Sequence, residues 1–190
     1  MEDLMEHTVN DHIIVRPFSL TSDLTGIVAL YQACFGEAPW FEVFDPAELA
    51  TEFQRLTTWP ETVILIAEQS GKIVGGTVGF DLKRQTDVAE LLGPQSAPHF
   101  YLSELFVDQS RRKQGIAEQL MRERFKVARF LGYSKGVVRT SVNQPIIRAI
   151  YARLEFTLAA IQHVESVKLV NGVEELRTDE RVILRGKIPL

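Results

Sequence analysis

The segment from residue 101 to residue 117 has the sequence YLSELFVDQSRRKQGIA. Its first part, Tyr101 to Val107, is rich in apolar and aromatic residues and predicts a strand. A short polar turn over residues 108–111 leads into a basic run and Gly115, and apolar residues then recur at helical spacing until Gly132 ends the pattern. The segment therefore predicts a strand, a basic turn and the N-terminus of a helix.

The start of this helix is suited to binding phosphate. The first N–H groups of a helix have no partner inside it and carry a partial positive charge. Gly115 lets a ligand approach the backbone, and the small Ala117 keeps that approach open. Arg111, Arg112 and Lys113 add charge that can pair with phosphate oxygens, although a charge run of this kind can also be a solvated turn.

On the N-terminal side of this segment, the pattern predicts two helices and a hairpin. Gly75, Gly76 and Gly79 interrupt the second hairpin strand and indicate a bulge or the close approach of another backbone. Residues 81–98 carry mixed charge, glycine and prolines, and predict a long loop. The expected elements are a strand over residues 13–18, a helix capped by Ser22 or Asp23 and ended by Gly36, a helix beginning at Pro46, and antiparallel strands over 62–68 and 72–80.

On the C-terminal side, a strand over residues 136–140 and a helix over residues 145–154 follow the helix of the opening segment. Alternation of strand and helix predicts a parallel pair of strands with a right-handed crossover. The tail from residue 156 onward returns to β-type composition, with Asn171-Gly172 as its turn. We therefore expect the α+β class: a central mixed, mostly antiparallel sheet with one parallel pair, flanked by helices.

Composition favours one soluble domain over residues 1–190, with residues 1–11 as a flexible leader. The chain is 45% hydrophobic and 24% charged, enough apolar material for one core. A formal net charge of -4 argues against nucleic acid as a partner. Cys34 is the only cysteine, so we expect no intrachain disulfide, no cysteine-based metal site and a reducing cytoplasm. A polar N-terminus and the lack of an apolar run approaching about 18 residues argue against a membrane.

Two motifs in the chain resemble those of the GNAT superfamily of N-acetyltransferases. The acetyl-CoA pyrophosphate loop of that family has Arg or Gln, two variable residues, Gly, one variable residue, then Gly or Ala, and Arg112, Gly115 and Ala117 match it. A later family motif, an asparagine, a short helix, a tyrosine and a terminal Gly-Phe, resembles residues 143–156, with Glu155 where glycine is usual. Asn143 is suited to cap the short helix. The resemblance implies a GNAT-like fold with acetyl-CoA as co-substrate and no metal.

The resemblance also implies roles for individual residues. The main chain at Phe106 and Val107 would align pantetheine as an added strand does, and the Val107 N–H would bond the thioester carbonyl. Tyr151 would be the general acid for the leaving thiolate; a core tyrosine is the alternative. The residues expected to bind acetyl-CoA are Phe106, Val107, Arg112, Lys113, Gln114, Gly115, Ile116, Ala117, Asn143 and Tyr151.

Glu104 is the candidate general base, because it is the only acid in the strand before the loop. Burial among its apolar neighbours would raise its pKa from about 4.3 towards neutrality. Two alternatives stay open: Glu104 binds a cationic substrate without moving a proton, or it pairs with a nearby base. His99 or His163 could serve as the base instead.

Acetyl transfer to a small primary amine, such as a polyamine, an amino sugar or an aminoglycoside, is the function that the sequence favours. A cationic acceptor would suit the acids Glu37, Glu42, Asp45 and Glu104, with Trp40 and Phe41, if these face a cleft; the aromatics could equally pin a loop to the core. The alternatives are a non-catalytic acyl-CoA-binding or regulatory domain and acetylation of a protein N-terminus or lysine. We also expect a homodimer formed through residues 162–187.

Overall fold

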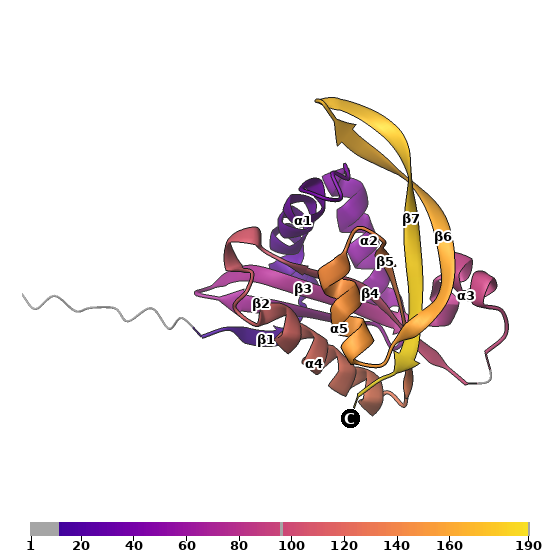
Figure 1. Cartoon of the computed structure of the whole chain (residues 1–190). Coiled ribbons are helices and arrows are strands. Elements are labelled where there is room, and N and C mark those ends of the chain that lie inside the picture. Colours follow the sequence, from indigo (N-terminus) through magenta and orange to yellow (C-terminus); the bar gives the residue numbers. More distant parts are fainter. Residues whose placement is uncertain (1–11, 96, 190) are drawn as a thin grey trace, which may run out of the picture.

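The central sheet has seven strands in the order β1-β2-β3-β4-β5-β7-β6 within residues 12–95 and 97–189, the part of the chain that the computed structural model describes (Figure 1). Only the neighbours β4 and β5 are parallel. The predicted α+β class is confirmed, and the predicted leader lies outside the described residues. The strands are β1 (Ile14–Pro17), β2 (Val63–Gln69), β3 (Lys72–Asp81), β4 (His99–Val107), β5 (Lys135–Ser141), β6 (Thr157–Val170) and β7 (Val173–Lys187).

Helices cover both faces of the sheet (Figure 1). The sheet thus separates the hydrophobic core into two clusters, one on each face. One cluster packs α4 against residues such as Phe100 and Leu102 of the sheet. The other packs α1 and α2 against Val78 and Phe106 on the opposite face. The α-helices are α1 (Leu20–Gly36), α2 (Pro46–Thr58), α3 (Thr86–Leu92), α4 (Ile116–Phe130) and α5 (Pro145–Arg153), and the 3-10 helices are η1 (Leu82–Arg84) and η2 (Gln109–Arg111).

Two local predictions are wrong. The helix α1 begins earlier than expected, with Ser19 at its N-cap, because the Asp23 carboxylate accepts the Ser19 N–H from inside the helix and also pairs with Arg16. The stretch predicted as a long loop contains η1 and α3. The bulge that the strand glycines indicated is confirmed, because the register between β3 and β4 shifts at Gly79. At Gly76 an aromatic ring takes the place of a side chain, since a Cβ there would lie 2.5 Å from the Phe106 ring.

The parallel pair is short, and its strands then separate. Pairing runs only from His99 to Tyr101 in β4 and from Lys135 to Val137 in β5. Beyond this point β4 stays paired with β3 as far as Val107, while β5 stays paired with β7. Within the described residues, the second half of β4 is therefore unpaired on the side that faces β5.

A bulge in β4 changes which residues face the helices. The register between β3 and β4 shifts by one residue between the pairs Val78 with Glu104 and Phe80 with Tyr101. Leu102 packs in the α4 cluster before the shift, and Leu105 packs against the same cluster after it. One extra residue in β4 produces this change, because successive strand residues otherwise alternate between faces. The bulge therefore turns the consecutive residues Ser103 and Glu104 towards the face that carries α1 and α2.

The strands β6 and β7 form a long twisted hairpin that extends beyond the rest of the sheet (Figure 1). Asn171 and Gly172 make its turn with positive φ angles of 52° and 80°, as predicted. The segment between α1 and α2 joins the hairpin: the Leu169 N–H donates to the Phe41 oxygen at 2.8 Å, and the Val43 N–H donates to the Val167 oxygen at 3.1 Å. This segment is thus fixed between α1 and the hairpin.

Candidate active site

A pocket of about 490 Å³ lies between α2, the sheet and the segment from Arg84 to Thr86. Its lining includes two groups of aromatic rings in contact, Tyr31 with Phe44 and Phe53, and Trp59 with Phe80. Ser103 and Glu104, which the β4 bulge turns towards this face, also line the pocket. The pocket therefore combines an apolar wall with a polar group from the strand predicted to carry the chemistry.

Glu104 lines this pocket with restricted access to solvent. Burial raises the pKa of its carboxyl from the ordinary 4.5 to about 7, while a hydrogen bond from the Ser103 hydroxyl at 3.1 Å and the charge of Arg139 act in the opposite direction. Burial and the nearby Glu104 carboxylate also raise the pKa of Tyr31 well above its usual range. A carboxyl that titrates near neutrality can accept a proton at physiological pH.

Four acids and two arginines line the pocket. Asp45 and Glu104 were expected from the sequence, whereas Glu48 and Glu52 of α2 were missed. Both arginines lie against Trp59, with the Arg55 guanidinium 4.1 Å and the Arg84 guanidinium 5.3 Å from the ring centroid. Arg55 also pairs with Glu52.

The other residues expected to face an acceptor are engaged elsewhere. Glu42 pairs with Arg181 at 2.7 Å, and the Arg181 guanidinium lies 4.4 Å from the centre of the Trp40 ring. Glu37 pairs with Arg112, and Phe41 is exposed and is not among the pocket residues. The interpretation that Trp40 anchors a loop agrees with this packing. Only part of the predicted acidic cluster therefore belongs to the pocket.

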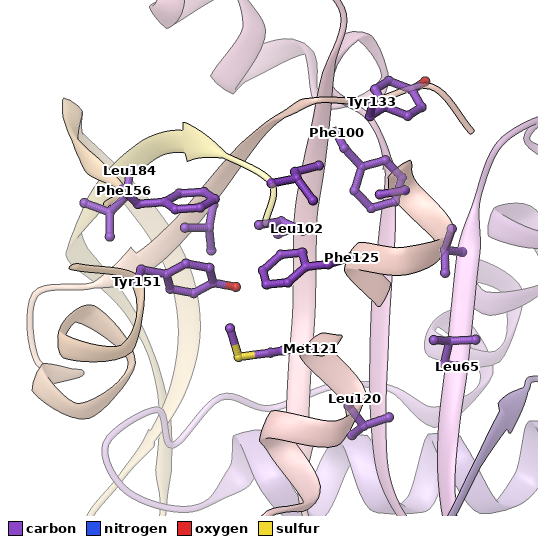
Figure 2. Close-up of a cluster of buried hydrophobic side chains, with 14 of the residues drawn as sticks. Leu65, Phe100, Leu102, Leu120, Met121, Phe125, Tyr133, Tyr151, Phe156 and Leu184 are labelled. Atoms are coloured by element: carbon purple, nitrogen blue, oxygen red, sulfur yellow. The ribbon is translucent and has the colours of Figure 1, made fainter. Parts of the chain in front are cut away.

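Tyr151 lies on the opposite side of the sheet, where α5 meets α4. Figure 2 shows its ring pointing from α5 towards Phe125 and Met121 of α4. The side chain is 2% exposed, and its hydroxyl oxygen accepts a hydrogen bond from Arg124 Nη2 at 3.0 Å. Burial raises the pKa of Tyr151, and the charge and hydrogen bond of Arg124 lower it in part. Among the described residues, no acceptor lies within hydrogen-bonding distance of the hydroxyl hydrogen.

The predicted phosphate loop has the backbone of an anion-binding site. Lys113 and Gly115 have positive φ angles of 63° and 79°, and α4 begins directly after them. Within the described part of the chain, the main-chain N–H groups from Lys113 to Ala117 donate to no protein acceptor. Consecutive N–H groups in such a turn form a concave site for an anion, and the dipole of α4 adds to it. Gln114 and Gly115 are exposed on this turn, whereas the Ile116 side chain is buried in the α4 cluster.

Side chains of the same motif have further contacts. Arg112 donates from Nε to the Val107 oxygen at 3.1 Å and pairs with Glu37. Its guanidinium thus joins the loop to β4 and to the segment after α1. The prediction that Asn143 caps α5 is wrong, and the N-cap is Gln144. Asn143 belongs to the preceding turn, where its N–H donates to the hydroxyl of Ser141, two residues earlier, at 3.1 Å.

Neither histidine proposed as an alternative base lies in the pocket. His99 is buried at the start of β4, where its Nδ1 lies 2.8 Å from the Ala97 oxygen, and burial lowers its pKa. His163 is exposed on β6, 3.8 Å from Glu180. Glu104 is therefore the candidate base that the pocket supports.

The described residues, 12–95 and 97–189, offer neither a metal-binding cluster nor a membrane-spanning helix. No grouping of three or more His, Cys, Asp or Glu side chains in this part of the chain could hold a metal ion. No helix in it is long and apolar enough to cross a membrane.

Solved structures of several acetyltransferases share this fold. The ribosomal-protein-alanine N-acetyltransferase of Brucella melitensis matches 92% of this chain and 99% of its own, with a TM-score of 0.67 and 14% identity. Arabidopsis thaliana NAA60, in complex with acetyl-CoA, matches 93% and 99% with a TM-score of 0.67 and 18% identity. The acetyltransferase yncA of Salmonella typhimurium, with its cofactor acetyl-CoA, matches 93% and 94% with a TM-score of 0.65 and 14% identity. At these identities the likeness establishes the fold.

Sequence comparison gives the family. A curated relative, the probable N-acetyltransferase family 8 member 5 of Mus musculus, is 36% identical over 91 residues, which are 48% of this chain and 37% of that protein. The match therefore spans well under two thirds of that relative. The model of the acetyltransferase (GNAT) family matches residues 24–156, more than half of the chain. The resemblance inferred from residues 101–156 is thus confirmed, and the chain belongs to the GNAT acetyltransferase family.

Proposed function

We propose that this protein transfers the acetyl group of acetyl-CoA to a small, cationic primary amine by direct attack within a ternary complex. The observation that carries the proposal is Glu104, a carboxyl with a pKa of about 7 in an aromatic-walled pocket lined by further acids. An amine attacks a thioester only in its neutral form, so a base of this strength beside the acceptor is useful at neutral pH.

The donor side of the proposal rests on the loop before α4. The free N–H groups from Lys113 to Ala117 and the nearby basic side chains suit the pyrophosphate of acetyl-CoA. The unpaired edge of β4 beyond Tyr101 suits a pantetheine chain, because an extended amide can add to a strand edge. Donor and acceptor would then meet at the second half of β4.

The chemistry assigns one proton transfer to each side of the sheet. Glu104 accepts the proton of the attacking amine, directly or through a water, as the N–C bond forms. The electron pair of the breaking C–S bond stays on sulfur, and Tyr151 gives its hydroxyl proton to that sulfur. Exchange with water afterwards restores Glu104 to its ionised form and Tyr151 to its neutral form. The main-chain N–H of Val107 polarises the carbonyl.

Two features of the pocket favour a small cation over a protein substrate. Asp45 and Glu48 line the same pocket as Glu104 and attract positive charge, while the aromatic side chains accommodate an apolar or sugar-like body. The segment between α1 and α2 is hydrogen-bonded to β6 on both sides of Glu42, which closes that end of the site. A peptide that extends across the site would have to displace these hydrogen bonds.

The proposal is tested by thiol release from acetyl-CoA with a panel of acceptors. The panel contains diamines, amino sugars, neutral amines and short peptides with free N-termini. We expect saturable turnover with at least one small cationic amine and a lower kcat/KM for every peptide. Preference for a peptide would favour protein acetylation, and tight CoA binding without turnover on any acceptor would favour a non-catalytic binding domain.

Gly115→Val is expected to weaken CoA binding about tenfold or more. A Cβ at Gly115 meets no atom within 4 Å, but its φ of 79° strains a β-branched residue by about 1–3 kcal/mol, so the loop must change its backbone. Isothermal titration with CoA measures the effect. Gly132→Val is the matched control, since Gly132 has a φ of 92°, equal free space and a place at the other end of α4. Equal CoA affinity in both variants would contradict the assignment of the loop.

We also propose that two copies associate through the β6–β7 hairpin. The strand β6 is an edge of the sheet, and exposed apolar side chains gather on the hairpin. Light scattering is expected to give twice the chain mass of 21.5 kDa, and Leu169→Glu with Leu176→Glu is expected to give a monomer. A wild-type monomer would end the proposal. The exposed apolar residues are Leu158, Ile161, Val167, Leu169, Val173 and Leu176.

A further inference from the structure

Arg124 of α4 is a buried cation to which the proton transfers above assign no role. Its side chain is 0% exposed and is the largest fully buried side chain of the described residues. None of the carboxylates in this part of the chain lies within ion-pair distance of its guanidinium. Burial of an unpaired charge is costly, so its hydrogen bonds must explain its presence.

One side of the guanidinium binds the bulge in β4. Arg124 Nη1 donates to the Glu104 main-chain oxygen at 2.8 Å and to the Val78 oxygen at 3.1 Å. Val78 and Glu104 are the partners at which the β3–β4 register shifts. The Thr77 hydroxyl also donates to the Glu104 oxygen, at 2.7 Å. Arg124 therefore holds the backbone of the residue whose carboxyl lies in the acceptor pocket.

The other side of the guanidinium binds Tyr151. Arg124 Nη2 donates to the Tyr151 hydroxyl oxygen at 3.0 Å. A guanidinium has no acceptor, so the hydroxyl hydrogen must point away from Arg124 and is left for another acceptor. The positive charge also favours the ionised hydroxyl that remains after this hydrogen has been given away. Both effects are what a general acid needs from its neighbour.

We propose that Arg124 is a positioning residue that links the two proton-transfer groups of the acetyl transfer. It orients the Tyr151 hydroxyl, stabilises the phenolate after the proton moves to sulfur, and keeps the Glu104 backbone in its bulge. Arg124 itself gains and loses no proton. This inference rests on the proposed function, because it requires Tyr151 to act as the general acid.

A double-mutant cycle tests the link between Arg124 and Tyr151. The variants are Arg124→Gln, Arg124→Lys, Tyr151→Phe and the two double variants, with Arg129→Gln as the control for loss of an exposed arginine from the same helix. Each is checked by circular dichroism and thermal unfolding, and the Kd for CoA is measured beside kcat. The acceptor is the best amine of the panel.

Arg124→Gln is expected to lower kcat by about ten- to a hundredfold, a part of what a general acid contributes, with the Kd for CoA changed by less than about threefold. In the Tyr151→Phe background the same change is expected to cost less than in the wild type, because only its effect on the Glu104 backbone remains and residues that act as a unit are not additive. Arg124→Lys keeps the charge and is expected to lose less than Arg124→Gln. Arg129→Gln is expected to keep the wild-type kcat.

Three results would overturn the inference. The first is an equal loss of kcat from Arg124→Gln in both backgrounds, and the second is no loss at all. The third is failure of both Arg124 variants to fold with CoA present, which would assign the residue to stability alone. A wild-type protein that acetylates no amine would instead overturn the proposed function, and this inference with it.

Discussion

Glu104→Gln is expected to lower kcat by about 10²- to 10⁴-fold, the usual contribution of a general base. Glutamine has nearly the same shape but cannot accept a proton, so the pocket should survive while the proton transfer is lost. The Kd for CoA should change by less than about threefold, because the predicted phosphate loop is a separate part of the site. Steady-state kinetics with the best amine, together with titration of CoA, measures both quantities.

The same variant distinguishes a base from a substrate anchor. If Glu104 only binds the cation, Glu104→Gln should raise the KM for the amine and leave kcat within about threefold, since uniform binding affects KM alone. A kcat near the wild-type value would therefore contradict the base assignment. A loss of kcat without a comparable rise in KM would support it.

Thermal unfolding gives a readout of Glu104 that does not depend on activity. Its pKa is raised from 4.5 to about 7 on folding, so between these pH values the folded state keeps a proton that the unfolded state has released. Stability contributed by the protonated carboxyl is present below pH 4.5 and is lost as the pH rises to about 7. Above pH 7, Glu104→Gln is expected to melt a few degrees higher than wild type, because about 1 kcal/mol shifts the Tm of a chain this size by about 2–4 °C.

Tyr151→Phe is expected to lower kcat by about 10²-fold through loss of the proton donor to the leaving thiolate. It removes one oxygen from a side chain that is 2% exposed and leaves the ring, which packs 5.1 Å from the Phe156 ring between centroids. The variant should therefore fold and bind CoA. Its kcat is measured by thiol release under saturating acetyl-CoA and amine.

Tyr133→Phe is the control for loss of a buried hydroxyl from the same core cluster. The Tyr133 hydroxyl donates to Glu61 and Asp81, away from the proposed site, so its loss should lower the Tm and keep kcat. Equal values of kcat in both variants would show that Tyr151 is a core tyrosine and not an acid.

Local sequence patterns predicted most of the fold. The glycine-led start of α4, the turn at Asn171-Gly172 and the proline start of α2 each follow from short-range preferences of the backbone. The same is true of the phosphate loop, which is one continuous segment. These features do not depend on contacts with distant residues, so the sequence alone specifies them.

The acceptor pocket could be predicted only in part, because it is assembled from distant segments. Glu104 was predicted as a site residue because it is the only acid in its strand. The bulge that turns its side chain into the pocket could not be predicted in the same way, because it depends on the register between β4 and β3. Glu48 and Glu52 could have been found, since they lie one turn apart and follow Asp45 at helical spacing. Glu37 and Glu42 were expected in the pocket because a sequence does not reveal their partners Arg112 and Arg181.

The burial of Arg124 could also have been predicted from its position in the sequence. It lies four residues after Leu120 and four before Ala128, both of which are 0% exposed, and so occupies the middle of the apolar stripe of α4. A charged side chain in the apolar stripe of a helix is expected to be buried. Its partners could not be inferred, because Val78, Glu104 and Tyr151 come from three other elements.

The pH dependence of kcat/KM for the amine tests the central claim, that Glu104 accepts the proton of the acceptor, most directly. It should be measured with two amines whose own pKa values differ. Wild-type activity is expected to fall as the pH drops through about 7 with both amines, because protonated Glu104 cannot act as a base, and Glu104→Gln should lack this limb. A limb that moves with the pKa of the amine and persists in Glu104→Gln would contradict the account.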